Sequence, residues 1–301
     1  MNDQLESANQ AQDSVNRRSL IGQFGASAAT IMAVGAAAAG GAALSSQPAA
    51  AQGITDIDIL NFALNLEYVE AQYYIAAFLG RPLDAADTTG VGGAPGFVLG
   101  GSAVPFQTES VAAYAQKITI DEVNHVRFLR RVLGAQAVAQ PNIDLLNSFN
   151  DLGVAAGLIP AGTQFNPFAD ETSFLLGAFI FEDVGVTAYG GAARLLVNKD
   201  YLDAAASILA IEAYHAGTVR TVLGAFGQQD AADAISAVRA KAGGGKEQGL
   251  RVGANLRFNT SPSDSDSLAF RRTTTEVLNI VYNGNKFGGG FLPNQMNGTI
   301  R

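Results

Sequence analysis

The segments DEVNHVRFL (Asp121–Leu129) and IEAYHAGTV (Ile211–Val219) hold the two histidines of this 301-residue chain, and each histidine follows a glutamate by three positions. The pairs are Glu122 with His125, and Glu212 with His215. Only ten residues are glutamate, so chance would place one three positions before both histidines about once in 900 sequences. Glu-x-x-His on facing helices is a ligand motif of bundles that bind two metal ions. The two segments therefore predict a metal centre between helices.

Two further segments complete an internal repeat: NLEYVEAQYY (Asn65–Tyr74) and FEDVGVTAY (Phe181–Tyr189). In each, a tyrosine follows a glutamate by seven positions. These pairs are Glu67 with Tyr74, and Glu182 with Tyr189. The chain thus reads Glu-x6-Tyr, Glu-x-x-His, and then the same order again. This indicates two halves with the same chemistry.

Helical geometry explains why these residue types suit a metal centre. Residues three or four apart share one face of a helix, so a glutamate and a histidine can both point into the core of a bundle. Four carboxylates and two imidazoles suit two iron or two manganese ions, and these ligands leave the choice between the metals open. The predicted ligands are Glu67, Glu122, His125, Glu182, Glu212 and His215. Tyr74 and Tyr189 are expected to hydrogen-bond the ligands, although tyrosines at helical spacing also serve as core residues.

Other interpretations of these residues remain open at this stage. A single Glu-x-x-His pair is usually a solvated pair on a helix surface. The apolar segment FLLGAFIFEDVGVTAY argues against that for Glu182, because a buried carboxylate needs a partner. Without metal, the carboxylates would share protons with both histidines. Glu70 lies three positions after Glu67 and is an alternative ligand, a supporting acid or a partner for Arg127 or Arg131.

Residues 1–52 are predicted to be a cleaved signal peptide of the twin-arginine type. Arg17 and Arg18 precede an Ala/Gly-rich run from Ile21 to Leu44, and Pro48–Ala51 offers a small-x-small cleavage site. An uncleaved anchor is the alternative, because the run exceeds the ~20 residues that span a bilayer. This segment predicts a periplasmic or extracellular protein that carries its metal through export already folded.

The composition excludes several classes of function. The chain has no cysteine, so disulfides and thiolate ligands are excluded. Cleavage after residue 51 would remove two arginines and three acids and leave a net charge of −7. The sequence has no basic patch that would indicate nucleic acid or an anionic membrane as a partner.

Apolar periodicity and capping signals predict an all-α protein. Thr55 and Asp58 are expected to form a capping box at the start of the first helix, and Gly80 is expected to end it. Four long helices are expected over roughly residues 55–79, 107–133, 170–197 and 201–226, with shorter ones near 143–152, 230–241 and 269–282. The long connection after the second helix predicts a crossover, so that the second and third helices run parallel. We expect the bundle to span residues 53–242. Residues 243–301 should form an extension that wraps it, anchored by Phe287, Phe291 and Leu292.

The chain resembles the ferritin-like superfamily, and more closely the exported ferritin-like family that includes desiccation-related proteins. The most similar segments are LNFALNLEYVEAQYY and FEDVGVTAYGGAA, and the tail phrases EVLNIVYN and GGGFLPNQMNG also match. The resemblance covers roughly residues 56–226. It implies a ferritin-like four-helix bundle with metal ligands at the six positions named above, all of which are filled. Storage ferritins are shorter, so a storage cage is not expected.

Such a centre predicts an oxidoreductase that acts on peroxide or dioxygen, either catalase-like or ferroxidase-like, in stress protection. No catalytic side chain separate from the metal ligands is evident. The alternative is a non-catalytic metal-binding or structural protein that protects against desiccation. A small molecule is the expected partner of the enzyme, and a homo-oligomer is compatible with the sequence.

Overall fold

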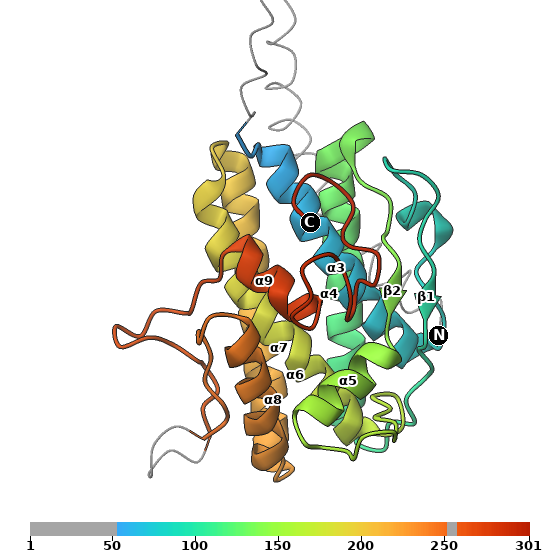
Figure 1. Ribbon diagram of the computed structural model, residues 1–301, viewed down its shortest axis with the longest axis vertical. Coiled ribbons are helices and arrows are strands. Elements are labelled where there is room, and N and C mark those ends of the chain that lie inside the picture. Colours follow the sequence, from blue (N-terminus) through green and yellow to red (C-terminus); the bar gives the residue numbers. More distant parts are fainter. Residues whose placement is uncertain (1–52, 252–257) are drawn as a thin grey trace, which may run out of the picture. The chain divides into compact units, whose positions relative to one another are not determined.

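The computed structural model describes residues 53–251 and 258–301, and its elements are labelled as in Figure 1. The predicted signal peptide lies outside these residues. The long helices are α3 (Asp56–Leu79), α4 (Glu109–Leu133), α6 (Glu171–Ala192) and α7 (Lys199–Ala225). The shorter elements are α5 (Asn147–Ala155), α8 (Gln229–Ala242), α9 (Thr274–Val281), β1 (Val98–Leu99) and β2 (Ile143–Asp144). The described chain is mostly helical, which confirms the predicted all-α class.

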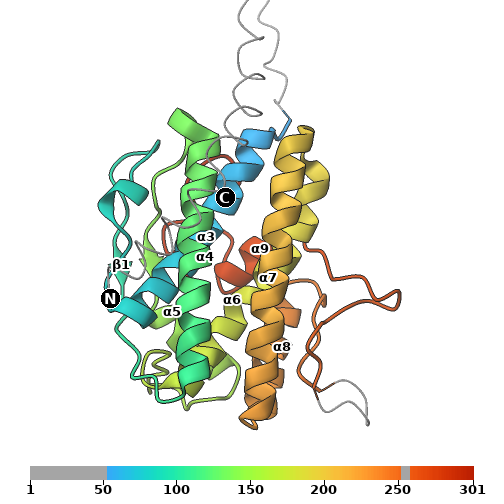
Figure 2. The ribbon, with the colours of Figure 1, turned by 180° about the vertical axis from the view of Figure 1, so that it is seen from behind.

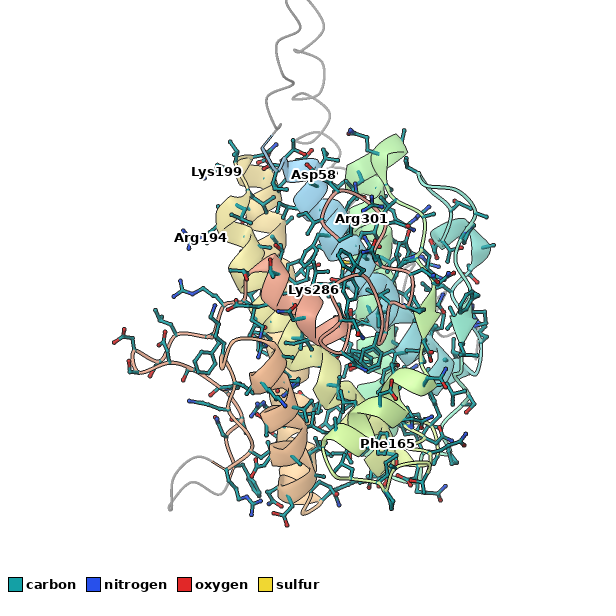
Figure 3. All side chains as sticks on the ribbon, viewed as in Figure 1. Asp58, Phe165, Arg194, Lys199, Lys286 and Arg301 are labelled. Carbon is teal, nitrogen blue, oxygen red and sulfur yellow. The ribbon has the colours of Figure 1, made fainter. Side chains whose placement is uncertain are left out.

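The four long helices form two antiparallel pairs, α3 with α4 and α6 with α7 (Figures 1 and 2). The starts of α4 and α6 lie together, because the Glu171 carboxylate accepts hydrogen bonds from the Gln107 and Thr108 amides at 3.0 and 2.9 Å. The starts of α3 and α7 lie together at the other end, where Figure 3 shows Asp58 and Lys199. The long connection between α4 and α6 is therefore a crossover that makes these two helices parallel, as predicted.

Local capping signals fix where these helices begin and end. Thr55 and Asp58 form a reciprocal capping box at the start of α3, as the sequence predicts. Gly80 ends α3 in the left-handed conformation with a φ of 66°, which favours glycine. Asp170 caps α6 by accepting from the Ser173 amide at 2.7 Å. These caps mark the start of α3 and α6, the helices that carry Glu67 and Glu182.

The glycine-rich segment before α4 pairs with the crossover. β1 and β2 are parallel, with Val98 opposite Ile143. A Cβ at Gly90 would lie 2.5 Å from the amide nitrogen of Ala139, so only glycine permits this approach of two backbones. The segment is therefore a loop fastened to the crossover.

The structure corrects the bounds of three predicted helices and one predicted anchor. The helix expected at 143–152 is a short strand followed by α5, because Asp144 accepts from the Leu146 and Asn147 amides and ends the extended segment. The third helix ends at Ala192 and continues as a 3-10 turn to Leu195. The helix expected at 269–282 begins only at Thr274, because Thr273 is extended and forms a capping box. Phe287 is 83% exposed and anchors nothing, since it precedes a glycine turn.

The C-terminal segment inserts an aromatic side chain into the core. Phe291 is buried, and its ring centroid lies 5.0 Å from that of Phe149 and 4.9 Å from that of Phe181. The Arg272 amide donates to the carbonyl of Thr187 on α6 at 2.9 Å. These contacts hold residues 258–301 against α6, whose apolar surface they cover.

Helix α6 is the apolar centre of the fold. Among the described residues, only the helical stretch Glu171–Leu195 is long and apolar enough to cross a membrane, but 83% of the apolar window within it is buried in the protein. Its one buried acid outside the ligand set, Asp183, accepts from Arg220 at 2.8 and 2.9 Å and from Arg239 at 2.6 Å. The ion pairs explain how a second carboxylate is tolerated beside Glu182.

Candidate metal centre

The six predicted ligand side chains come together in the core of the bundle. The four glutamates are fully buried, and the histidines are 5–9% exposed. They form two overlapping groups, and one ligand atom from each member lies within 4.8 Å of the others. The first group contains Glu67, Glu122, His125 and Glu212, and the second contains Glu122, Glu182 and His215. Glu122 belongs to both groups, so it lies between two possible metal positions.

His125 faces three carboxylates through its Nδ1 atom. This atom lies 3.3 Å from Glu67 Oε2, 3.4 Å from Glu122 Oε2 and 3.7 Å from Glu212 Oε1. The three glutamates come from α3, α4 and α7, so the histidine collects oxygens from three helices at one level. The i, i+3 spacing of Glu122 and His125 puts both on the inner face of α4.

His215 faces the other side of the cluster through its own Nδ1 atom. This atom lies 3.0 Å from Glu122 Oε1 and 3.3 Å from Glu182 Oε2. The Nε2 atom of the same ring lies 3.0 Å from Asp121 Oδ2. His215 is therefore held between the cluster on one side and a carboxylate of α4 on the other.

The two tyrosines connect the helix pairs through the ligands. The Tyr74 hydroxyl on α3 donates to Glu182 Oε1 on α6, and the Tyr189 hydroxyl on α6 donates to Glu67 Oε1 on α3. Each tyrosine thus bonds the glutamate of the opposite repeat, where the sequence alone left the partner open. These bonds fix one oxygen of each terminal glutamate and leave the other free.

The polar atoms that remain without a hydrogen bond define what the cluster can bind. Glu67 Oε2 and Glu182 Oε2 have no hydrogen-bond partner, and neither does either oxygen of Glu122 and Glu212. The Nδ1 atoms of both histidines also have no hydrogen-bond partner. Buried polar atoms are rarely left unbonded, because each costs about 1–3 kcal/mol. Eight such atoms around one centre fit a set of metal ligands, with one free oxygen on each of Glu67 and Glu182 and two on each of Glu122 and Glu212.

The comparison with protein families agrees with this geometry. The model of the ferritin-like domain matches residues 55–225, which contain all six side chains. The chain belongs to this family. This ferritin-like chain is 28% identical over 270 residues to the ferritin-like catalase Nec2 of Nesocodon mauritianus, covering 81% of this chain and 84% of that relative. It is 29% identical over 245 residues to the desiccation-related protein PCC13-62 of Craterostigma plantagineum, covering 74% and 76%. No solved structure matches the chain.

Burial and mutual charge set the protonation of the cluster in this ferritin-like protein. Burial raises the pKa of Glu67 to about 7 against the opposing effect of His125. Burial also disfavours ionised Glu122, but both histidines outweigh it and hold the pKa of that carboxyl well below its usual range. Glu182, Asp121 and Glu122 raise the pKa of His215 to about 12, although burial favours the neutral ring. Without metal, the cluster therefore keeps protons that a metal would displace.

Glu70 is a fifth buried carboxylate at the edge of the cluster. Burial and the charges of Glu122 and Glu67 raise its pKa well above the usual value. The proposed pairing with Arg127 is wrong, because that arginine pairs with Asp87 at 2.8 Å and with Asp84. Within residues 53–251 and 258–301, Glu70 also forms no ion pair with Arg131. The metal groups contain Glu67 and not Glu70.

Two residues that shape the site were not singled out from the sequence. Asp121 pairs with His215, but the Glu-x-x-His motif includes only its neighbour Glu122. Gly185 makes room for carboxylates, because a Cβ there would lie 2.9 Å from Glu212 Cδ and 3.3 Å from Glu70 Oε1. Both residues could have been found by aligning the two repeats residue by residue, because the repeats differ at these positions. The alignment places Gly185 opposite Glu70, and Ile211 opposite Asp121.

Proposed function

We propose that this protein binds two iron or two manganese ions in the bundle core and acts as an oxidoreductase on peroxide. The observation that carries the proposal is the convergence of eight unbonded polar atoms from six buried side chains. Carboxylate and imidazole ligands without thiolate suit iron and manganese. Four carboxylates neutralise the charge of two divalent ions, so the filled cluster would be tolerated in an apolar core.

The side chains have distinct roles in this proposal. Glu122 would hold both metals and Glu212 the one near His125, because both oxygens of each are free of hydrogen bonds and only Glu122 belongs to both groups. Glu67 and Glu182 would each hold one metal through a single oxygen, since tyrosines bond their other oxygens. The bound metals would supply the electrons for cleavage of the O–O bond by changing oxidation state. The chain itself holds the geometry, keeps bulk water out and offers Glu70 as a buried acid.

One of the two relatives supports catalase-like chemistry as the specific reaction. It carries the name ferritin-like catalase and aligns over 81% of this chain. Ferroxidase chemistry on dioxygen uses the same ligands, and the metal present would decide between them. We also propose that residues 1–52 direct export by the twin-arginine route, which would place the activity outside the cytoplasm. A homo-oligomer is compatible with this proposal.

Elemental analysis of protein purified without chelator is the decisive test. We expect close to two iron or manganese ions per chain, together with oxygen release from peroxide. Glu122→Ala and His125→Ala should lose metal and turnover together, because both face the centre. Asp203→Asn, an exposed change on α7, is the control and should keep both. Full turnover in Glu122→Ala would refute the site.

A non-catalytic role in stress protection is the second candidate, favoured by the similarity to a desiccation-related protein. In that case the metal would stabilise the bundle, and the centre would be closed to substrate. The discriminating result is tight retention of two metals without any reaction with peroxide or dioxygen. Unchanged thermal stability after removal of the metal would contradict this second role.

A further inference from the structure

The two halves of the cluster differ at the position before each Glu-x-x-His. Asp121 precedes Glu122 on α4, whereas Ile211 precedes Glu212 on α7. Asp121 Oδ2 lies 3.0 Å from His215 Nε2, so a carboxylate of the first half supports the histidine of the second half. The repeat offers no carboxylate at position 211 to support His125 in return. The symmetry of the six ligands does not extend to the residues behind them.

In the neutral ring that would bind a metal, the contact with Asp121 fixes the tautomer of His215. A carboxylate accepts, so the ring donates from Nε2, and the lone pair is left on Nδ1. Nδ1 is the atom that faces Glu122 Oε1 and Glu182 Oε2, at 3.0 and 3.3 Å. An imidazole that donates a hydrogen bond to a carboxylate is also a stronger metal ligand. Asp121 is held in turn by Lys117, one helical turn earlier on α4.

His125 lacks this support within the part of the chain that the structure describes. Its Nδ1 faces Glu67, Glu122 and Glu212, but no carboxylate pairs with its Nε2 there. Its ring is 9% exposed, compared with 5% for His215. The position near His125 therefore relies on its three carboxylates, and the position near His215 relies on two carboxylates and a fixed imidazole.

We propose that Asp121 is a positioning residue on which one of the two metal positions depends and the other does not. The dependent position is the one formed by Glu122, Glu182 and His215. This inference rests on the proposed dinuclear centre. Removal of an outer carboxylate that orients a histidine ligand typically lowers metal affinity about 10- to 100-fold. We expect that loss at one of the two ions only.

The test is a Mn²⁺ titration of the metal-free full chain, followed by calorimetry and by the electron paramagnetic resonance signal of free Mn²⁺. The wild type should bind two ions. Asp121→Ala should keep one with unchanged affinity and bind the other about 10- to 100-fold more weakly. Asp121→Asn, which keeps an acceptor but no charge, should show a smaller loss. Asp203→Asn removes the same charge from the exposed face of α7 and should change neither step.

A double-mutant cycle assigns the affected position. After His215→Gln, the further change Asp121→Ala should have no effect on the remaining ion, whereas after His125→Gln it should still weaken binding. Equal weakening of both ions by Asp121→Ala, or no weakening, would overturn the inference. Failure of the wild type to bind any Mn²⁺ or Fe²⁺ would instead refute the proposed function, so the two failures are distinct. Circular dichroism of each metal-free variant shows whether it has folded.

Discussion

The substitution Gly185→Ala should weaken metal binding without replacing any ligand. Gly185 lies inside α6, where alanine normally stabilises a helix by up to about 1 kcal/mol. Here the added methyl group would lie 2.9 Å from Glu212 Cδ, and nearer still to its Oε2. The carboxyl group of Glu212 fills the space that the missing Cβ leaves, so the two cannot occupy it together.

The size of the displacement decides the outcome. Non-bonded carbon atoms prefer about 3.5–4.0 Å, so the Glu212 carboxyl carbon must retreat by at least about 0.6 Å. Metal–ligand distances tolerate about 0.2 Å. Glu212 is fully buried, and Glu70 Oε1 lies 3.3 Å from the same methyl position, which blocks one direction of escape. We therefore expect metal affinity to fall at least about 10-fold, the lower end for disturbed metal sites.

Two glycine variants serve as controls in the same Mn²⁺ titration. Gly217→Ala on α7 meets only the Thr260 carbonyl oxygen at 3.6 Å, an ordinary contact, and should leave affinity unchanged. Gly177→Ala on α6 would place a methyl group 2.9 Å from Tyr73 Cζ, away from the ligands. It should lower thermal stability and keep two metals per chain. The reasoning fails if Gly185→Ala binds two ions with wild-type affinity.

Three other changes test further parts of the structure. Tyr189→Phe removes the donor to Glu67, which should weaken Mn²⁺ binding about 10- to 100-fold in the same titration. Asp183→Ala strands Arg220 in the core, so the free energy of unfolding in urea should fall by about 3–5 kcal/mol; an unchanged midpoint would contradict a paired core. Without metal, the folded protein should lose stability as the pH rises from 5 to 8. Burial raises the pKa of Glu67 to about 7, so the folded state keeps a proton that the unfolded chain releases near pH 4.5. The raised pKa of His215 acts in the same direction above about pH 6.5, and equal urea midpoints at pH 5 and pH 8 would refute this.

The sequence predicted the helices and the composition of the cluster because both depend on local spacing. A glutamate and a histidine three positions apart share a helix face whatever the tertiary fold. The capping residues Thr55 and Gly80 marked the ends of α3 for the same reason. Long apolar helices with such signals leave few alternatives to a bundle, and the family match agrees with that fold.

The contacts between helices could not be predicted in this way. The partner of Tyr74 is Glu182, on another helix pair, and spacing along one helix says nothing about it. The support of His215 by Asp121 depends on how α4 lies against α7. The exposed Phe287 shows the same limit in the tail, where an aromatic residue next to glycines does not reveal whether it points inward.

The two antiparallel helix pairs give the chain the geometry of a fused dimer. Each pair brings a Glu, a Glu-x-x-His and a Tyr, so one pair and a copy related by a two-fold axis would complete the same cluster. The crossover joins the two halves in one chain. Two halves of one chain can differ in sequence, and the place of Glu70 depends on such a difference. Its carboxylate lies over Gly185, the equivalent position of the other half, and identical subunits could not supply a glutamate and a glycine at one position.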